Sequence, residues 1–376
     1  MKIAQLGCFD RNIGDSLALW NPRIKLISLL GISSREWKSF NLIDFHKHGN
    51  NIMKCIDKFK FINQNYDVFL IGGAGLVEQW PWPRSGFGTG WKLPFDKETL
   101  DFIKIPIIVY GVGLNFYRGC HDMDKQAFES LQALIKQSAY FSVRSDGSYE
   151  NLKELFTRYK GDNEVFSKVK EVPDAALIIE KRFQSPRISK IGTKVFNPSW
   201  SNKKQIQDSR KYKLVYDNKD MTDMLKEQFK LYPHTDKDFG RLNGMREHMR
   251  RKTFNNLVKT GKAYEYLKTY NTFDLMAGMH AHAQLISIGM NVPCISISTV
   301  DKMSDFCEKH DLLDFDVDPK NYPNDKEFFE RFKYLNDSFC NDKDFLLSWY
   351  TKRDLLVDKF QTQYEEAMLE IKEIIS

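Results

Sequence analysis

Short apolar runs alternate with amphipathic stretches through the first half of the chain. The apolar runs are five or six residues long and predict strands at 2–6, 66–71, 105–110, 139–143 and 175–179. The stretches between them predict helices, including 15–30, 124–137 and 148–159. We expect the first helix to be interrupted at Pro22, because proline removes a backbone hydrogen bond. Strands that alternate with helices are typical of an α/β fold with a parallel sheet.

Most of these strands run directly into a loop of small or polar residues. The loops read GCFDRNIGD, GGAGL, GVGLN and RSDGS. In an open parallel sheet such loops gather at the carboxyl ends of the strands, where ligands bind. One glycine-rich loop says little, whereas several in succession, each after an apolar strand, indicate a ligand-binding edge.

The pattern restarts after a polar stretch at 180–193, which contains proline and glycine and predicts a linker. Further strands are expected at 194–196, 228–232, 272–276 and 293–297. Residues 345–375 carry apolar side chains mostly three or four apart and predict a long terminal helix. We therefore expect an N-terminal Rossmann-like domain over 1–185, a C-terminal Rossmann-like domain over 190–340, and a helix over 343–375 that packs across both.

Composition narrows the class of protein. The 376 residues are 42% hydrophobic and 28% charged, as in globular proteins. The net charge of +6 is too small for a nucleic-acid-binding surface and suits local basic pockets for small anions. The chain shows no apolar segment of signal-peptide or membrane-spanning length, and six scattered cysteines without a C-x-x-C pair. We expect a cytoplasmic protein; peripheral membrane association and the oligomeric state stay open.

The richest chemistry lies in the stretch 275–298, which reads LMAGMHAHAQLISIGMNVPCISIS. A strand ends near Gly278 and a helix follows, so His280 and His282 lie at a strand-to-helix junction. Free backbone N–H groups and the helix dipole favour an anion there. Histidine at such a position can bind a phosphate or carboxylate, or move a proton near neutral pH. The alternative is that one histidine caps the turn and the other packs in the core.

A metal site is the less favoured interpretation of this His-x-His pair. Metal-dependent hydrolases need further His or Asp ligands on later strands, and little chain remains after residue 280 to supply them. The alternating Asp314, Asp316 and Asp318 have Pro319 where a calcium loop needs glycine. We interpret them as a strand end or turn, and we expect no metal.

Arg144 and Asp15 each have a structural and a functional interpretation. Arg144 ends a predicted strand just before a helix that Asp146 or Ser148 could cap. Its planar fork suits a carboxylate or phosphate, but it could equally be an exposed arginine that pairs with Asp146 or Glu150. Asp15 is expected to be the N-cap of the first helix, with binding of a substrate hydroxyl as the alternative.

Taken in order, these blocks resemble the polysaccharide pyruvyl transferase family. In the first half, Asn12, Gly14 and Asp15 match N-x-G-D, and Gly72, Gly73 and Gly75 match G-G-x-G-L. The next loop is matched by Gly111, Gly113 and Asn115. Arg144, Asp146 and Ser148 match V-R-D-x-x-S with the aspartate shifted by one, and Asp174 matches D-x-A. In the second half they are His234 with Asp236 or Asp238, the block 278–283 for G-M-R-L-H-A, the block 289–293 for G-x-x-V-P, and Lys302.

The resemblance implies two Rossmann-like domains that face across a cleft, as in GT-B glycosyltransferases. It implies transfer of a pyruvyl group from phosphoenolpyruvate, without a cofactor, to two hydroxyls of a saccharide. The products are a cyclic ketal and phosphate, and the pathway is cell-surface or exopolysaccharide biosynthesis. The acceptor is a free, lipid-linked or nucleotide-linked saccharide, and nucleic acid is not a partner.

Residue roles follow from the same resemblance. The catalytic residues are expected to be His282, as first choice for proton transfer, together with His280 and Arg144. Substrate binding is expected at Asn12, Asp15, Gly72, Gly73, Gly113, Asn115, Ser148, His234, Asp238 and Lys302. This chain departs from the family at His280, where the family has an arginine expected to hold the phosphate or carboxylate. Histidine is shorter than arginine and only partly charged at pH 7. Either other groups, such as Arg144 and Lys302, hold the anion, or the preference for the donor or the acceptor has changed.

Two other functions fit parts of the pattern. A GT-B glycosyltransferase that uses a nucleotide-sugar donor would show similar domains and anion-binding loops. A non-catalytic glycan-binding protein of the same fold could stack Trp80, Trp82 or Trp91 on sugar rings.

Overall fold

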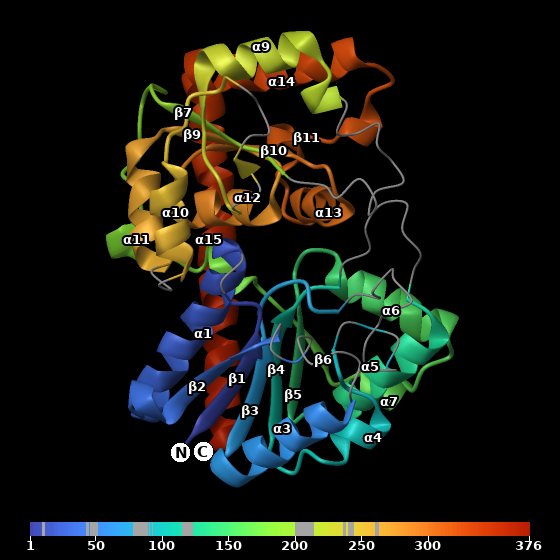
Figure 1. The fold of residues 1–376 in the computed structure, drawn as a ribbon. Helices are drawn as coiled ribbons and strands as arrows, with labels where there is room; N and C mark the ends of the chain where they lie inside the picture. The colour runs from blue at the N-terminus through green and yellow to red at the C-terminus, as the bar shows by residue number, and fades with distance from the viewer. Residues whose placement is uncertain are drawn as a thin grey trace.

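Two parallel β-sheets, stacked end to end along one long helix, form the molecule (Figure 1). The structure is a computed structural model. It describes residues 1–9, 12–42, 45, 52–77, 89, 91, 93–114, 123–199, 214–235, 238–239, 244–259 and 263–376. Among these residues, no helix is long and apolar enough to cross a membrane.

The first sheet has six strands in the order β2-β1-β3-β4-β5-β6, all parallel. Its strands are β1 (Ile3–Gly7), β2 (Trp37–Asn41), β3 (Val68–Gly72), β4 (Ile107–Val112), β5 (Tyr140–Arg144) and β6 (Val169–Val172). The helices of this half are α1 (Ile13–Leu30), α3 (Ile52–Asn65), α4 (Lys97–Leu100), α5 (Lys125–Gln137), α6 (Ser148–Arg158) and α7 (Asn163–Phe166). Successive side chains along each strand point alternately into one of two hydrophobic cores, one on each face of the sheet. Leu6, Phe69 and Phe141 pack against α3, α5 and α6 on one face, and Ile3 and Leu70 pack against α1 and α15 on the other.

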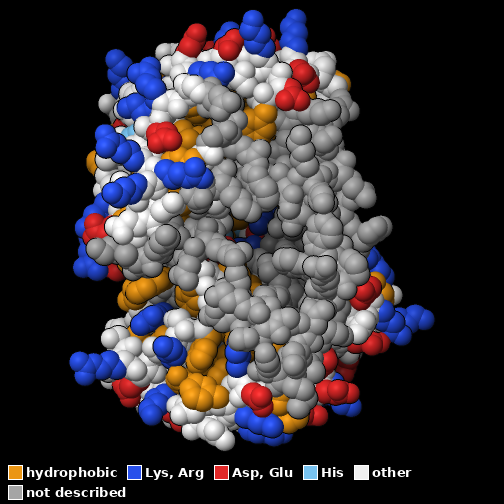
Figure 2. Space-filling model, viewed as in Figure 1, with side chains coloured by type: hydrophobic (Ala, Val, Ile, Leu, Met, Phe, Trp, Pro, Cys, Tyr) orange, Lys and Arg blue, Asp and Glu red, His pale blue; other side chains and the backbone are white. Residues whose placement is uncertain are grey.

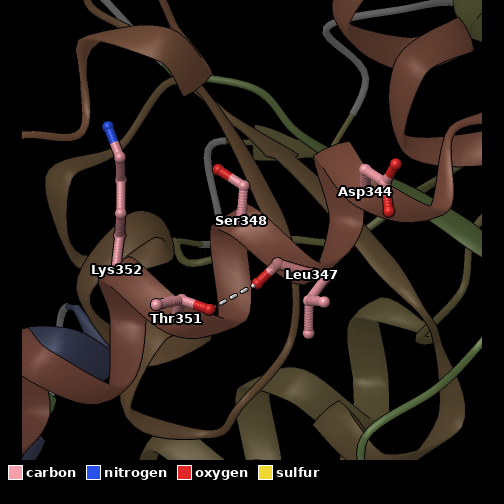
Figure 3. Close-up of a pocket in the computed structure, with 5 residues that line it drawn as sticks. All are labelled: Asp344, Leu347, Ser348, Thr351 and Lys352. Atoms are coloured by element: carbon pink, nitrogen blue, oxygen red, sulfur yellow. Dashed lines mark hydrogen bonds between the residues drawn. The ribbon is translucent and has the colours of Figure 1, made fainter.

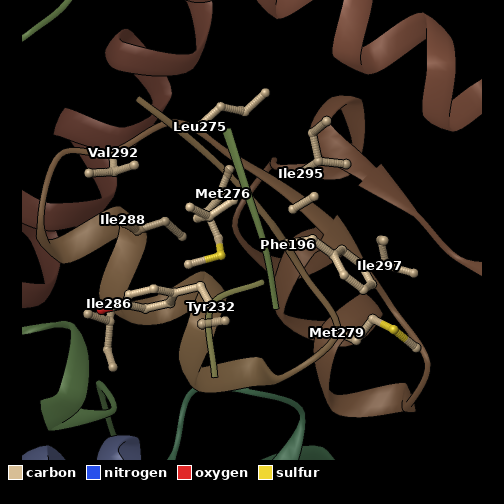
Figure 4. Packing of buried hydrophobic residues seen from close by; sticks show 14 of the residues in the cluster. Phe196, Tyr232, Leu275, Met276, Met279, Ile286, Ile288, Val292, Ile295 and Ile297 are labelled. Atoms are coloured by element: carbon tan, nitrogen blue, oxygen red, sulfur yellow. The ribbon is translucent and has the colours of Figure 1, made fainter. Parts of the chain in front are cut away.

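The second sheet has five parallel strands in the order β11-β10-β9-β7-β8. Its strands are β7 (Lys194–Asn197), β8 (Phe229–Leu231), β9 (Leu275–Gly278), β10 (Cys294–Ile297) and β11 (Asp316–Val317). The helices of this half are α9 (Lys219–Gln228), α10 (Arg251–Lys259), α11 (Ala263–Lys268), α12 (Ala281–Gly289), α13 (Asp301–Lys309) and α14 (Asp325–Asn341). Figure 4 shows the core between the sheet and α12, where Met276, Ile286 and Ile288 lie together.

Helix α15 (Lys343–Ile375) joins the two halves (Figure 1). Its first part buries Trp349 and Phe360 in the core of the second sheet, and its last part buries Met368 and Ile371 against the first. One continuous helix therefore belongs to both hydrophobic cores.

Two expectations from the sequence were wrong in detail, and one strand was missed. Pro22 does not interrupt α1. The residue before it, Asn21, donates from its side chain to the carbonyl oxygens of Ala175 (2.5 Å) and Ile178 (2.8 Å). These tertiary contacts hold the helix together at the proline. Residues 175–179 are not a strand, because the Asp174 side chain accepts from the Ala176 N–H at 2.9 Å and starts a 3₁₀ turn. The strand of that region is β6, and β2 was not predicted at all.

Candidate active site

The carboxyl ends of the two sheets face each other, and His282 bridges them. This side chain comes from the first turn of α12 in the C-terminal half and is 7% exposed. Its Nε2 lies 3.3 Å from Asp174 Oδ2, and its Nδ1 lies 3.6 Å from Asp15 Oδ1. Both carboxylates belong to the N-terminal half, so one imidazole contacts two acidic groups of the opposite domain.

Local sequence explains why the histidines lie at this edge. Strand β9 ends at Gly278, and His280 is the N-cap of α12 with extended backbone angles. Its side chain does not cap the helix. The N-terminus of α12 therefore lies at the carboxyl end of β9. Like any helix N-terminus, it carries N–H groups without a partner in the helix and the positive end of the dipole.

Arg144 and Asp174 form a buried ion pair at the end of the first sheet. Arg144 Nη1 lies 2.8 Å from Asp174 Oδ2, and Nη2 lies 2.8 Å from Asp146 Oδ2. Burial alone would lower the pKa of Arg144, but Asp146, Asp174 and Asp15 outweigh it and raise that pKa. Burial would likewise raise the pKa of Asp174, but Arg144 and His282 outweigh it and lower that pKa. Both groups therefore remain charged.

Two glycines let these side chains approach the backbone. A Cβ on Gly113 would lie 2.0 Å from Arg144 Nη2, and a Cβ on Gly14 would lie 2.1 Å from His282 Cγ. Any larger residue would displace the guanidinium or the imidazole. Gly14 is held in turn by Asn12, whose Oδ1 accepts from the Gly14 N–H at 2.9 Å.

A second group of polar side chains surrounds Asp238, which is completely buried. One carboxylate oxygen, Oδ2, accepts from the backbone N–H groups of His234 and Thr235, both at 2.8 Å. The other, Oδ1, accepts from Thr235 Oγ1 at 2.9 Å and from His280 Nε2 at 3.2 Å. Burial lowers the pKa of His234 well below its usual value, and that residue contacts Tyr270 OH through Nε2 at 3.1 Å.

The other predicted residues that the structure describes lie on neighbouring loops and helices of the two halves. Ser148 is buried, donates to Asp146 and accepts from the Leu114 N–H at 2.9 Å. Gly72 and Gly73 lie at the carboxyl end of β3, where the Gly73 N–H donates to the Tyr110 carbonyl oxygen at 3.2 Å. Lys302 is half-buried in the first turn of α13. Asn115 lies outside the described residues, as does Asp236.

Other expectations about individual residues were incorrect. The N-cap of α1 is Asn12, while Asp15 lies inside the first turn and faces His282. Helix α6 begins after Gly147 and has no side-chain cap. Arg144 is not exposed, since only 2% of its surface is accessible.

The structure also tests one of the tryptophans that were expected to stack on sugar rings. Trp91 is fully buried and donates from Nε1 to the Phe95 carbonyl oxygen at 3.1 Å, so it offers no face to a sugar. Trp80 and Trp82 lie outside the described residues.

Asp174 and Asp146 were not among the predicted site residues, although both stood in the quoted motifs. Asp174 lies two residues after the end of β6, and the strand expected at 175–179 placed it before a strand instead. Once β6 is placed at Val169–Val172, Asp174 is the residue expected at the ligand-binding edge.

The surface agrees with a site between the halves. Figure 2 shows Lys or Arg atoms between the two halves, near the centre of the view. A separate surface pocket is lined by Asp344, Leu347, Ser348, Thr351 and Lys352 (Figure 3). All five come from one stretch of α15, so this pocket lacks the convergence of several elements seen at the sheet edges.

Comparisons with known proteins point to one family and one fold. A model of the polysaccharide pyruvyl transferase family matches residues 12–301. No curated protein matches the chain. A Listeria monocytogenes protein assigned as a UDP-N-acetylglucosamine 2-epimerase is 9% identical, with 97% of each chain covered and a TM-score of 0.51. The Neisseria meningitidis UDP-GlcNAc 2-epimerase, solved with UDP-GlcNAc, is also 9% identical, with 96% of this chain and 100% of that chain covered and a TM-score of 0.50. These likenesses show a fold of two Rossmann-like domains of the GT-B type.

Proposed function

The chain belongs to the polysaccharide pyruvyl transferase family, and we propose that it transfers the pyruvyl group of phosphoenolpyruvate to two hydroxyls of a saccharide. The product is a cyclic ketal, and phosphate is released. The observation that supports this most is the contact of His282 with Asp15 and Asp174. It joins side chains of both domains where the two ligand-binding edges meet.

The proposed reaction sets clear chemical requirements. The methylene carbon of phosphoenolpyruvate gains a proton, and both acceptor oxygens bond to the adjacent carbon. The bond from that carbon to the bridging oxygen breaks, and phosphate leaves. Of the two hydroxyl protons, one balances the new methyl group and the other balances hydrogen phosphate. The enzyme therefore has to move protons and neutralise a departing phosphate.

Imidazoles and helix N-termini can meet these requirements. His280 and His282 both lie within hydrogen-bond reach of a carboxylate, which fixes the orientation of each ring. The charge of Arg144 is matched by Asp146 and Asp174. We therefore assign the phosphate to Lys302 and to the N-termini of α12 and α13, with Arg144 as the group that positions Asp174. The proposal uses phosphoenolpyruvate as a substrate and no resident cofactor or metal.

The proposal includes a saccharide acceptor that is free, lipid-linked or nucleotide-linked. It also includes a cytoplasmic location and a role in cell-surface or exopolysaccharide biosynthesis.

A donor screen tests the proposal. A ligand that binds only the native state raises the unfolding temperature, by an amount that grows with its concentration over Kd. We expect phosphoenolpyruvate to stabilise the protein and UDP-GlcNAc to have no comparable effect. Stabilisation by UDP-GlcNAc alone would reject phosphoenolpyruvate as the donor and favour a glycosyltransferase. Pyruvate and inorganic phosphate serve as controls, because each carries only one of the two anionic groups of the donor.

A further inference from the structure

The two histidines of the α12 turn have different surroundings, and these assign them different tasks. We propose that His280, held by Asp238, is the residue that transfers protons in the reaction, and that His282 is a positioning residue that joins the two domains. The inference rests on the proposed function for its substrate. It reverses the order of the two histidines expected from the sequence.

His282 has no ring nitrogen directed at open space. Its Nε2 lies 3.3 Å from Asp174 Oδ2, and its Nδ1 lies 3.6 Å from Asp15 Oδ1. One face of the ring lies against Gly14, where even a methyl group would overlap it. A substrate atom would have to displace a carboxylate to reach this imidazole, so its geometry suits a bridge between domains.

His280 is the more accessible of the two, with 18% of its side chain exposed. A carboxylate only accepts hydrogen bonds, so the Nε2 that lies 3.2 Å from Asp238 Oδ1 carries the proton. Among the described residues, no partner is found for Nδ1. One ring nitrogen is therefore anchored on a carboxylate while the other remains for a substrate, as in a catalytic His–Asp pair.

The surroundings of Asp238 fix this arrangement. Its other three donors come from His234 and Thr235. The His234 ring stacks beside that of His280, with centroids 6.1 Å apart and planes inclined by 17°. Because burial lowers the pKa of His234 well below its usual value, this neighbouring ring is uncharged at neutral pH. The His280 imidazole is thus held by a carboxylate and a flat neutral surface.

Balanced proton transfer follows from these positions. His280 Nδ1 supplies a proton to the methylene carbon, and the π electrons of the C=C bond of phosphoenolpyruvate form the new C–H bond while the first acceptor oxygen bonds to the adjacent carbon. The same nitrogen then accepts the proton of that acceptor hydroxyl, which restores its starting protonation state. The proton of the second hydroxyl leaves with the phosphate. An arginine at this position would not do this, because a guanidinium does not lose its proton in proteins.

The decisive variant is His280→Arg, which restores the residue of the family. Phosphate release from phosphoenolpyruvate is measured with a panel of p-nitrophenyl glycosides as acceptors. We expect His280→Arg and His280→Ala to lose about 100-fold or more in kcat, and added imidazole to restore part of the activity of His280→Ala. His282→Gln, which keeps an N–H for Asp174, should lose less, and imidazole should not rescue it. His248→Gln is the matched control, since His248 bonds to Thr272 in the same domain.

Wild-type activity in His280→Arg would overturn the proposal and assign this position to anion binding. Equal losses in His280→Ala and His282→Ala, with imidazole rescue of the latter only, would also overturn it. If the wild-type protein releases no phosphate with any glycoside, the proposed function fails instead. In that case acylation by diethyl pyrocarbonate still decides between the histidines, because it reacts with an open imidazole nitrogen. We expect it to modify His280 before His282, and the opposite order contradicts the assignment.

Discussion

Replacing Asp174 by Asn tests the buried charge cluster on which the site depends. The substitution keeps the size of the side chain and the oxygen that caps the Ala176 N–H. It removes the charge that lies 2.8 Å from Arg144 Nη1 and 3.3 Å from His282 Nε2. Removing one partner of a buried ion pair costs about 3–5 kcal/mol. Because Asp146 still pairs with Arg144, we expect the lower end, about 3 kcal/mol, in the free energy of unfolding.

The pH dependence of this loss has a defined sign. The folded protein lowers the pKa of Asp174, so its contribution is complete above the pKa of an unfolded aspartate, about 3.9. It disappears as the pH falls through the lower folded value. The difference between wild type and Asp174→Asn should therefore persist from pH 7 down to about 4 and shrink below it.

Urea unfolding followed by circular dichroism measures this difference. The control is Asp162→Asn, at an exposed aspartate that caps α7, since asparagine caps a helix about as well as aspartate. A change at Asp174 no larger than that of the control would refute the argument that the cluster is held by charge.

Three further variants test other parts of the structure. Met368→Ala should lower the free energy of unfolding by about 2–5 kcal/mol, because this side chain is fully buried under the first sheet. Its neighbour Leu369 is 46% exposed, so Leu369→Ala should change that free energy by about 0.5 kcal/mol or less. Burial lowers the pKa of His310 to about 4, so stability should fall between pH 6.5 and 4 by at most about 3 kcal/mol, and titration of His310→Gln should remove that part of the slope. Gly14→Ala should cost about 1–3 kcal/mol and reduce phosphate release, since its Cβ would overlap His282; unchanged kinetics would show that this ring is free to move.

Much of the fold follows from local patterns in the sequence. The strands β1, β3, β4 and β5 are buried apolar runs, and the sequence predicts the bounds of each to within two residues. Strand β2 was missed because it lies at the edge of the sheet, and its burial is mostly partial. An edge strand carries a weaker apolar pattern than a central one.

Side-chain interactions across long distances explain the other errors. Nothing near Pro22 in the sequence indicates that Asn21 will bond to residues more than 150 positions later. The partnership of Arg144 with Asp174 joins residues 30 apart, and it converts a predicted anion-binding group into a paired one. The two histidines were visible as a pair, but their partners were not: Asp238 reaches His280 through the fold of the C-terminal half, and the contact of His282 with Asp174 depends on how the domains meet. Sequence patterns locate this edge; the pairing of its charges depends on the tertiary structure.

The most direct test of the proposed activity is the identity of the product. The wild-type protein is incubated with phosphoenolpyruvate and p-nitrophenyl glycosides, and the products are analysed by mass spectrometry and proton NMR. We expect a glycoside heavier by pyruvate minus water, with a new methyl singlet and one phosphate released for each ketal. Phosphate release without a modified glycoside, or modification that requires a nucleotide sugar, would contradict it.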